Sequence, residues 1–174
     1  MDSFATVQQM ADRSGGAISA DHPYLRTALA AATREIRNVC GWHIAPLETL
    51  TKRGATSRAH EIWIPAQQIE SIDAVTLDGT VIDVAPETTT VLHNPDTGWT
   101  NLWAYRYSVT YSAGYRVIPE DLVELTLQMA ARALGATLGV EREQAGAVSV
   151  TYSAPVLLQE ERARLEAYKL GRIP

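Results

Sequence analysis

Histidines, one cysteine and several acidic pairs are the residues of this chain whose chemistry suits catalysis or metal binding. Two adjacent acids such as Glu160 and Glu161 point in different directions on a helix, so they do not share a proton as a catalytic carboxylate pair does. No two histidines have the i, i+4 spacing that places two metal ligands on one helix face; they stand at His22, His43, His60 and His93. The spacing therefore predicts neither a metal site nor an acid–base pair.

Cys40 is the single cysteine, which excludes an intrachain disulfide framework and a multi-cysteine metal site. It lies on an apolar stripe, where a small core residue is a better interpretation than a nucleophile. The sequence also lacks the glycine-rich phosphate and dinucleotide loops, the nucleophile-elbow motif and the H-E-x-x-H zinc motif. We therefore predict a protein that is not an enzyme and binds no cofactor.

The composition describes an ordinary globular protein of one domain, with 174 residues, 46% hydrophobic and 20% charged. Its formal charge of −5 argues against tight wrapping of DNA, which depends on clustered Lys and Arg, but it suits an acidic surface that DNA slides past. No apolar run approaches the roughly 20 residues that span a bilayer, and the N-terminus shows no basic region followed by an apolar one. We expect a soluble protein, made in the cytoplasm, with no membrane partner.

The stretch Tyr107–Leu138 is predicted to form the centre of the fold, around which the other elements are arranged. Alternation predicts a strand from Tyr107 to Tyr111, and Pro119 marks the first turn of a long helix. That helix is apolar almost all round, which indicates that other elements surround it. One polar stripe interrupts it at i, i+4 and i+8, formed by Glu124, Gln128 and Arg132.

A second long helix is predicted ahead of it, with Asp21 as N-cap, Pro23 in the first turn and Gly41 as the terminating residue. Residues 1–19 predict a short helix followed by a flexible turn at Ser14-Gly15-Gly16. Between the two long helices the hydrophobic period changes to two, which indicates a small, mostly antiparallel sheet. Its predicted strands are Leu47–Lys52, Glu61–Ile64, Ile69–Ile72 leading into Ala74–Leu77, a hairpin turn at Asp78-Gly79, Val81–Val84 and a further strand at Thr88–Leu92.

A loop predicted at His93–Gly98 precedes three large apolar residues, Trp99, Leu102 and Trp103. Two interpretations stay open for them. They cap the sheet of their own protein, or they form a contact between subunits, since aromatic residues are enriched in interface cores.

The C-terminal part predicts a polar, mobile loop at Glu141–Gly146, a strand at Ala147–Tyr152 and an amphipathic helix from about Pro155 to Leu170, ended by Gly171. Such a helix either folds back on its own domain or docks in the groove of a partner. The residue pattern alone does not decide between these alternatives.

Three stretches in this order resemble the head–tail adaptor proteins of long-tailed bacteriophages, also called head-completion or gp6-like connector proteins. They are the helix ending at Cys40-Gly41, the sheet with Ile62-Trp-Ile-Pro65 and Asp78-Gly79, and the strand–helix–strand–helix from Tyr107 to Tyr168. The chain departs from the family in its N-terminal segment and in the insertion Thr88–Trp103.

The resemblance implies an α+β protomer with an adaptor core at residues 1–138 and a portal-docking part at residues 139–174. It implies that removing Ser153–Pro174 leaves a folded domain that no longer binds portal. The implied portal-docking candidates are Val156, Leu157, Leu158, Leu165, Tyr168, Leu170 and Ile173. The inter-subunit candidates are Trp99, Leu102, Trp103, Val148, Val150 and Tyr152.

The implied function is structural. Adaptors of this family form a ring, usually of twelve copies, beneath the portal of the virion at the head–tail junction. The ring extends the DNA channel, joins the capsid to the next neck or tail protein, and lets DNA pass without sequence-specific binding. The alternatives are a tail terminator-type ring protein or, further from the pattern, a small cytosolic enzyme or ligand-binding domain.

Overall fold

The computed structural model of the chain describes residues 3–84, 91–135, 142–145, 148–151 and 157–171. The chain forms two compact units. Unit 1 contains Met1–Val39 and Ile118–Glu166, and unit 2 contains Cys40–Val117 and Ala167–Pro174. The long helices belong to unit 1 and a four-stranded antiparallel sheet belongs to unit 2, which confirms the predicted α+β class. The boundary predicted at residue 138 stays a prediction.

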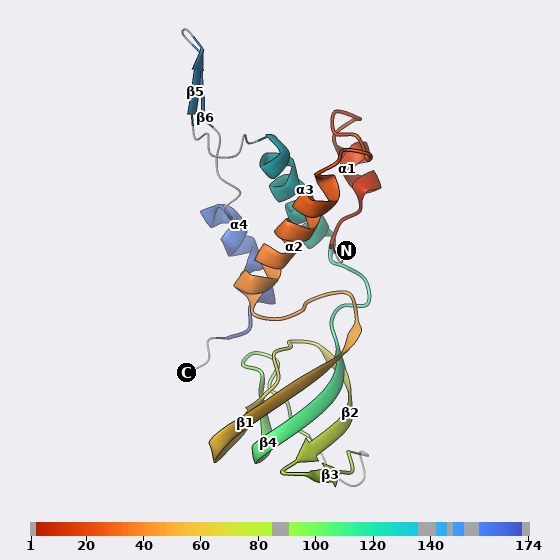
Figure 1. The fold of residues 1–174 in the computed structure, drawn as a ribbon, viewed down its shortest axis with the longest axis vertical. Coiled ribbons are helices and arrows are strands. Elements are labelled where there is room, and N and C mark those ends of the chain that lie inside the picture. The colour runs from red at the N-terminus through yellow and green to blue at the C-terminus, as the bar shows by residue number, and fades with distance from the viewer. Residues whose placement is uncertain (1–2, 85–90, 136–141, 146–147, 152–156, 172–174) are drawn as a thin grey trace. The chain divides into compact units, whose positions relative to one another are not determined.

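Unit 1 is built on helices α1 (Val7–Arg13), α2 (Leu25–Cys40), α3 (Glu120–Gly135) and α4 (Gln159–Arg164), the last followed by a 3₁₀ turn at Leu165–Tyr168. Helices α1, α2 and α3 meet in one apolar core, and in Figure 1 α2 crosses α3. The core residues are Ala5, Met10, Leu25, Leu29, Leu127 and Ala130. The two long helices and the short N-terminal one were all predicted from the hydrophobic period.

The start of α2 differs from the prediction. The helix begins at Leu25, because the Leu25 N–H bonds to the His22 carbonyl in a preceding turn, at 3.1 Å. Asp21 is therefore one turn outside the helix, and its assignment as N-cap was wrong. The predicted end is confirmed, since Gly41 follows α2 with a φ of 82°, in the left-handed region that glycine tolerates.

Unit 2 holds the sheet, with strand order β1 (Glu48–Trp63), β4 (Trp99–Ala113), β2 (Ile69–Leu77) and β3 (Thr80–Ile82), all antiparallel (Figure 1). Asp78 and Gly79 join β2 to β3 with φ angles of 51° and 89°. Two left-handed residues in a two-residue loop match the right-handed twist of the flanking strands. The predicted hairpin turn is confirmed.

Strands β1 and β4 are much longer than predicted. β1 joins the two predicted strands through residues 53–60, and β4 begins at Trp99 rather than Tyr107. Trp99, Leu102 and Trp103 were assigned to the region of a loop, but they lie in β4, paired with β1. Pairing with β1 gives the backbone N–H and C=O groups of this region their hydrogen-bond partners. Hydrogen bonding to a distant segment therefore decides its structure, against the loop that the local sequence pattern predicts.

Strand β1 bends sharply in its middle. The Lys52 ammonium lies 5.4 Å from the centre of the Trp63 ring, although a straight strand would separate residues 52 and 63 by about 36 Å. The bend coincides with the register shift between Ala55 and His60. On β4 the buried side changes accordingly, from Thr100, Leu102 and Ala104 to Val109, Tyr111 and Ala113.

A substitution of Gly98, in the turn before β4, is a test of this bend. The φ of Gly98 is 80°, and a Cβ there would lie 2.5 Å from Trp63 Nε1 and 2.8 Å from the Ile64 carbonyl oxygen. Gly79 has a similar φ of 89° but nothing within 4 Å of such a Cβ. We expect Gly98→Ala to lower the free energy of unfolding by about 1–3 kcal/mol more than Gly79→Ala, because only Gly98 adds an overlap. Urea unfolding measures both, and equal losses would contradict the contact.

The C-terminal region departs from the prediction in two places. Strand β5 (Arg142–Ala145) occupies the predicted polar loop and pairs with β6 (Val148–Thr151) in a separate two-stranded sheet. The predicted helix from Pro155 to Leu170 is the shorter α4 and its 3₁₀ turn. The predicted strand Thr88–Leu92 lies largely outside the described residues.

Candidate interaction surfaces

The polar stripe on α3 fastens two other helices of unit 1. Glu124 accepts hydrogen bonds from Arg13 of α1, at 3.1 and 2.8 Å, and from Gln128, at 2.9 Å. Arg132, one turn further along, donates to Glu161 of α4. The stripe that interrupts an otherwise apolar helix in the sequence is thus the line of attachment for α1 and α4.

The pair between Arg132 and Glu161 is buried. Both guanidinium Nη atoms donate to the carboxylate, at 2.6 and 2.8 Å, and the Leu158 N–H donates to it as well, at 2.9 Å. Only 5% of Glu161 is exposed. Burial raises the pKa of Glu161, but the hydrogen bonds from Arg132 and Leu158 and the charges of Arg132 and Arg164 outweigh it and lower the pKa. Glu161 is ionised at neutral pH and holds α4 to α3.

The predicted portal-docking residues fall into three groups. Leu157 and Leu165 are buried, Leu158 is 44% exposed, and Tyr168 and Leu170 are partly buried. Val156 and Ile173 lie outside the described residues. Two apolar side chains of the predicted docking face are therefore already covered by their own protein. Their docking role stays a prediction.

The segment Ala167–Gly171, here called the C-terminal strap, is tied to the rest of unit 2. The Tyr168 ring lies edge-on to the Tyr115 ring, with 6.0 Å between their centres. Four hydrogen bonds add to this contact: Trp42 Nε1 to the Tyr168 carbonyl at 2.6 Å, Gln67 Nε2 to the Lys169 carbonyl at 2.8 Å, Leu170 N–H to the Cys40 carbonyl at 3.0 Å, and Gly171 N–H to the Asp96 carbonyl. The strap therefore contacts four separate stretches of unit 2.

The predicted inter-subunit residues differ in how far their side chains are exposed. Trp103 is 62% exposed, Leu102 is buried and Trp99 is partly buried. Val148 and Val150 lie in β6, and Tyr152 lies outside the described residues. Sequence analysis missed Tyr105, which is 53% exposed and shares the alternating side of β4 with Trp103. Its position two residues after Trp103, on the same side of an alternating strand, was the signal in the sequence that could have identified it.

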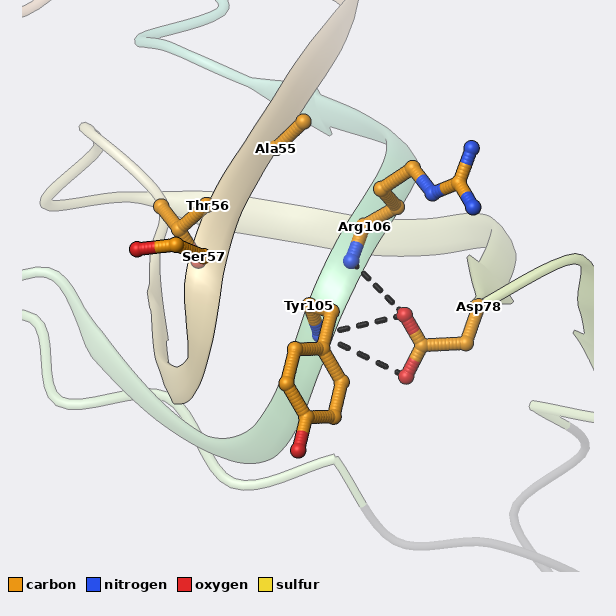
Figure 2. Close-up of a pocket in the computed structure, with 6 residues that line it drawn as sticks. All are labelled: Ala55, Thr56, Ser57, Asp78, Tyr105 and Arg106. Carbon is orange, nitrogen blue, oxygen red and sulfur yellow. Dashed lines mark hydrogen bonds between the residues drawn. The ribbon is translucent and has the colours of Figure 1, made fainter.

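Tyr105 borders a shallow hollow of about 740 Å³, shown in Figure 2. The dashed bonds in Figure 2 run from the Asp78 carboxylate to the backbone N–H groups of Tyr105 and Arg106, the shortest at 2.7 Å. Asp78 thus continues the pairing of β4 where β2 ends, and its charge is directed at the backbone. The lining residues are Ala55, Thr56, Ser57, Asp78, Tyr105 and Arg106.

Neither a metal centre nor a membrane span is present in the part of the chain that the structure describes. No three His, Cys, Asp or Glu side chains there are grouped to hold an ion, and no described helix is long and apolar enough to cross a bilayer. Cys40 is buried, as predicted for a small core residue.

Comparison with known proteins gives a likeness of fold. No family model and no curated protein matches the sequence. The solved structures that match it include a chain in the neck of a native GTA particle computed with C12 symmetry and a chain in the neck of an empty GTA particle computed with C6 symmetry. The TM-scores are 0.61 and 0.63, the identities 13% and 14%, and each match covers 97% of this chain and 90% of the neck chain. At this identity the likeness establishes a shared fold.

Proposed function

We propose that this protein is a head–tail adaptor, a structural component of the neck of a phage or phage-like particle. The observation that carries the proposal is the extent of the fold likeness. It runs through 97% of this chain and 90% of a chain from the neck of a gene transfer agent, a phage-like particle. The likeness therefore extends over the helical unit and the sheet alike, and is not confined to one element of the fold.

In this role the protein forms a ring at the head–tail junction, beneath the portal and above the next neck or tail protein. The C12 and C6 symmetries of the matched necks support a ring, with twelve copies as the expected number. Copies in a ring contact each other through two different surfaces, so that the rotation closes. The ring extends the DNA channel, and the protein's net charge of −5 suits a channel that DNA passes without base-specific contacts.

Portal docking is assigned to the C-terminal part, as the resemblance implies. The burial of Leu157 and Leu165 limits how this happens. A helix α4 that stays in place presents Leu158 and its charged outer side to the portal, whereas a helix that inserts Leu157 and Leu165 must first leave α3. The substitution Leu158→Ser leaves the buried residues untouched and weakens docking only in the first case.

Native mass spectrometry of the purified protein over a wide concentration range tests the proposal. A closed ring of defined copy number is the expected result, either for the protein alone or after addition of portal rings from the same particle. A protein that stays monomeric and also fails to bind those portal rings would contradict the adaptor assignment.

A further inference from the structure

We propose that the exposed surface around Trp103, Tyr105 and Arg106 of unit 2 binds the acidic unit 1 of a second copy of this chain. The proposal rests on the proposed function, because it names one of the two surfaces that a ring of copies requires. We call this surface the aromatic–arginine patch; it consists of Trp103, Tyr105, Arg106 and residues 55–58 of β1, where the register shift begins.

The patch exposes two large aromatic side chains. Trp103 and Tyr105 are 62% and 53% exposed, on a strand whose neighbouring positions Leu102 and Ala104 are buried. Two large aromatic side chains in water next to each other leave apolar surface uncovered. Trp, Tyr and Arg are the residue types that most often dominate the binding energy of protein interfaces. All three occur here between residues 103 and 106.

The patch also carries positive charge. Arg58 and Arg106 are exposed, and neither guanidinium group has an ion pair or hydrogen bond with another described residue. Asp78, which lines the hollow beside Arg106, accepts hydrogen bonds from the backbone N–H groups of Tyr105 and Arg106 (Figure 2). The patch therefore presents positive charge that its own strand region leaves unpaired.

The two units differ in net charge. Unit 1 contains twelve acidic and eight basic residues, a formal charge of −4, whereas unit 2 contains eight acidic and seven basic residues, a charge of −1. Most of the negative charge of the protein thus lies in the unit that lacks the patch. Electrostatic complementarity between surfaces favours encounter and fixes orientation. Unit 1 of a second copy supplies the complementary sign.

The geometry of such a contact agrees with ring formation. The patch lies on unit 2 and its partner on unit 1, so the two surfaces are different and the contact is head-to-tail. A head-to-tail contact generates a closed ring when its rotation closes, whereas a contact between identical surfaces stops at a dimer. The hollow between Ser57, Asp78 and Tyr105 gives the patch a concave part that can receive a side chain of the neighbour.

Sedimentation velocity of the whole chain at low and high salt tests the proposal. We expect the unmodified protein to self-associate, more weakly at high salt because exposed charges are screened. Trp103→Ser and Arg106→Glu should each weaken self-association by about tenfold or more, the loss typical of a central interface residue. Val117→Ser is the matched control, since Val117 is 81% exposed in unit 2 and lies outside the patch; it should leave self-association unchanged.

Two results would overturn the assignment. Self-association that persists unchanged in both patch variants, with urea unfolding confirming their fold, means that another surface joins the copies; the adaptor function then stands. A protein that is monomeric at low salt up to its solubility limit means that a second copy is not the partner of this patch. The adaptor function is tested separately in that case, by binding to portal rings.

Discussion

Replacing Arg132 with alanine is expected to lower the free energy of unfolding by about 3–5 kcal/mol, because it leaves a buried carboxylate without its cation. Glu161 would keep one hydrogen bond, from the Leu158 N–H at 2.9 Å, and lose both bonds from Arg132. The charge that remains is only 5% exposed and cannot be solvated in place. We expect α4 to separate from α3 before the rest of unit 1 unfolds. Urea unfolding gives the free energy, and hydrogen exchange of residues 159–168 gives the local separation.

Arg13→Ala is the matched control on the same stripe. It removes a second bidentate pair, with Glu124, whose side chains are 63% and 35% exposed. Exposed ion pairs contribute little because water solvates the partner that remains. The double substitution Arg132→Leu with Glu161→Leu should recover part of the stability, since it removes both charges from the buried site. Equal losses for Arg13→Ala and Arg132→Ala would contradict this account of the stripe.

The same pair gives stability a definite dependence on pH. The pKa of Glu161 is lower in the folded protein than in the unfolded chain, so the contribution of its charge is complete at neutral pH. That contribution falls as the pH drops below about 4.3, the ordinary pKa of a glutamate, and is lost below the folded pKa. Glu161→Gln is therefore expected to lose less stability than the unmodified protein between neutral pH and this acidic range.

Local signals were sufficient for the elements that local chemistry determines. Gly41 ends α2, Asp78 and Gly79 form the hairpin turn, and α3 begins just after Pro119. The lengths of β1 and β4 could not be predicted, because residues 53–60 and 99–106 become strands only by pairing with each other. Nothing local in the sequence indicates that pairing, because polar residues dominate the first of these segments and turn residues come directly before the second.

The candidate surfaces were predictable to a similar degree. Trp103 was identified as an inter-subunit candidate, but the contribution of Tyr105 and Arg106 depends on the bend of β1 and on the position of Asp78. For α4, the amphipathic pattern of Leu157 and Leu165 is the same for a helix that folds back and for one that docks in a partner. Only the buried partner of Glu161 on α3 distinguishes the two, and that partner lies 29 residues away in sequence.

Removing residues 167–174 is expected to lower the free energy of unfolding by about 3–4 kcal/mol, because each of the four strap hydrogen bonds contributes about 1 kcal/mol. The Trp42 indole N–H would lose the Tyr168 carbonyl, and the Asp96 carbonyl would lose the Gly171 N–H. The emission of Trp42, which is buried, should shift to longer wavelength as water reaches it. Removal of residues 172–174 alone is the control, since it leaves every one of these bonds in place.

This expectation changes how the C-terminal part should be tested for docking. The resemblance implies that removal of Ser153–Pro174 leaves a folded domain without portal binding, yet that deletion also removes Glu161 and the whole strap. Loss of portal binding would then follow from unfolding as readily as from a lost docking surface. A protein without residues 167–174 that keeps its full stability would show that the strap contacts contribute nothing, and the longer deletion would again be informative. If stability falls as expected, Leu158→Ser is the variant that separates docking from folding.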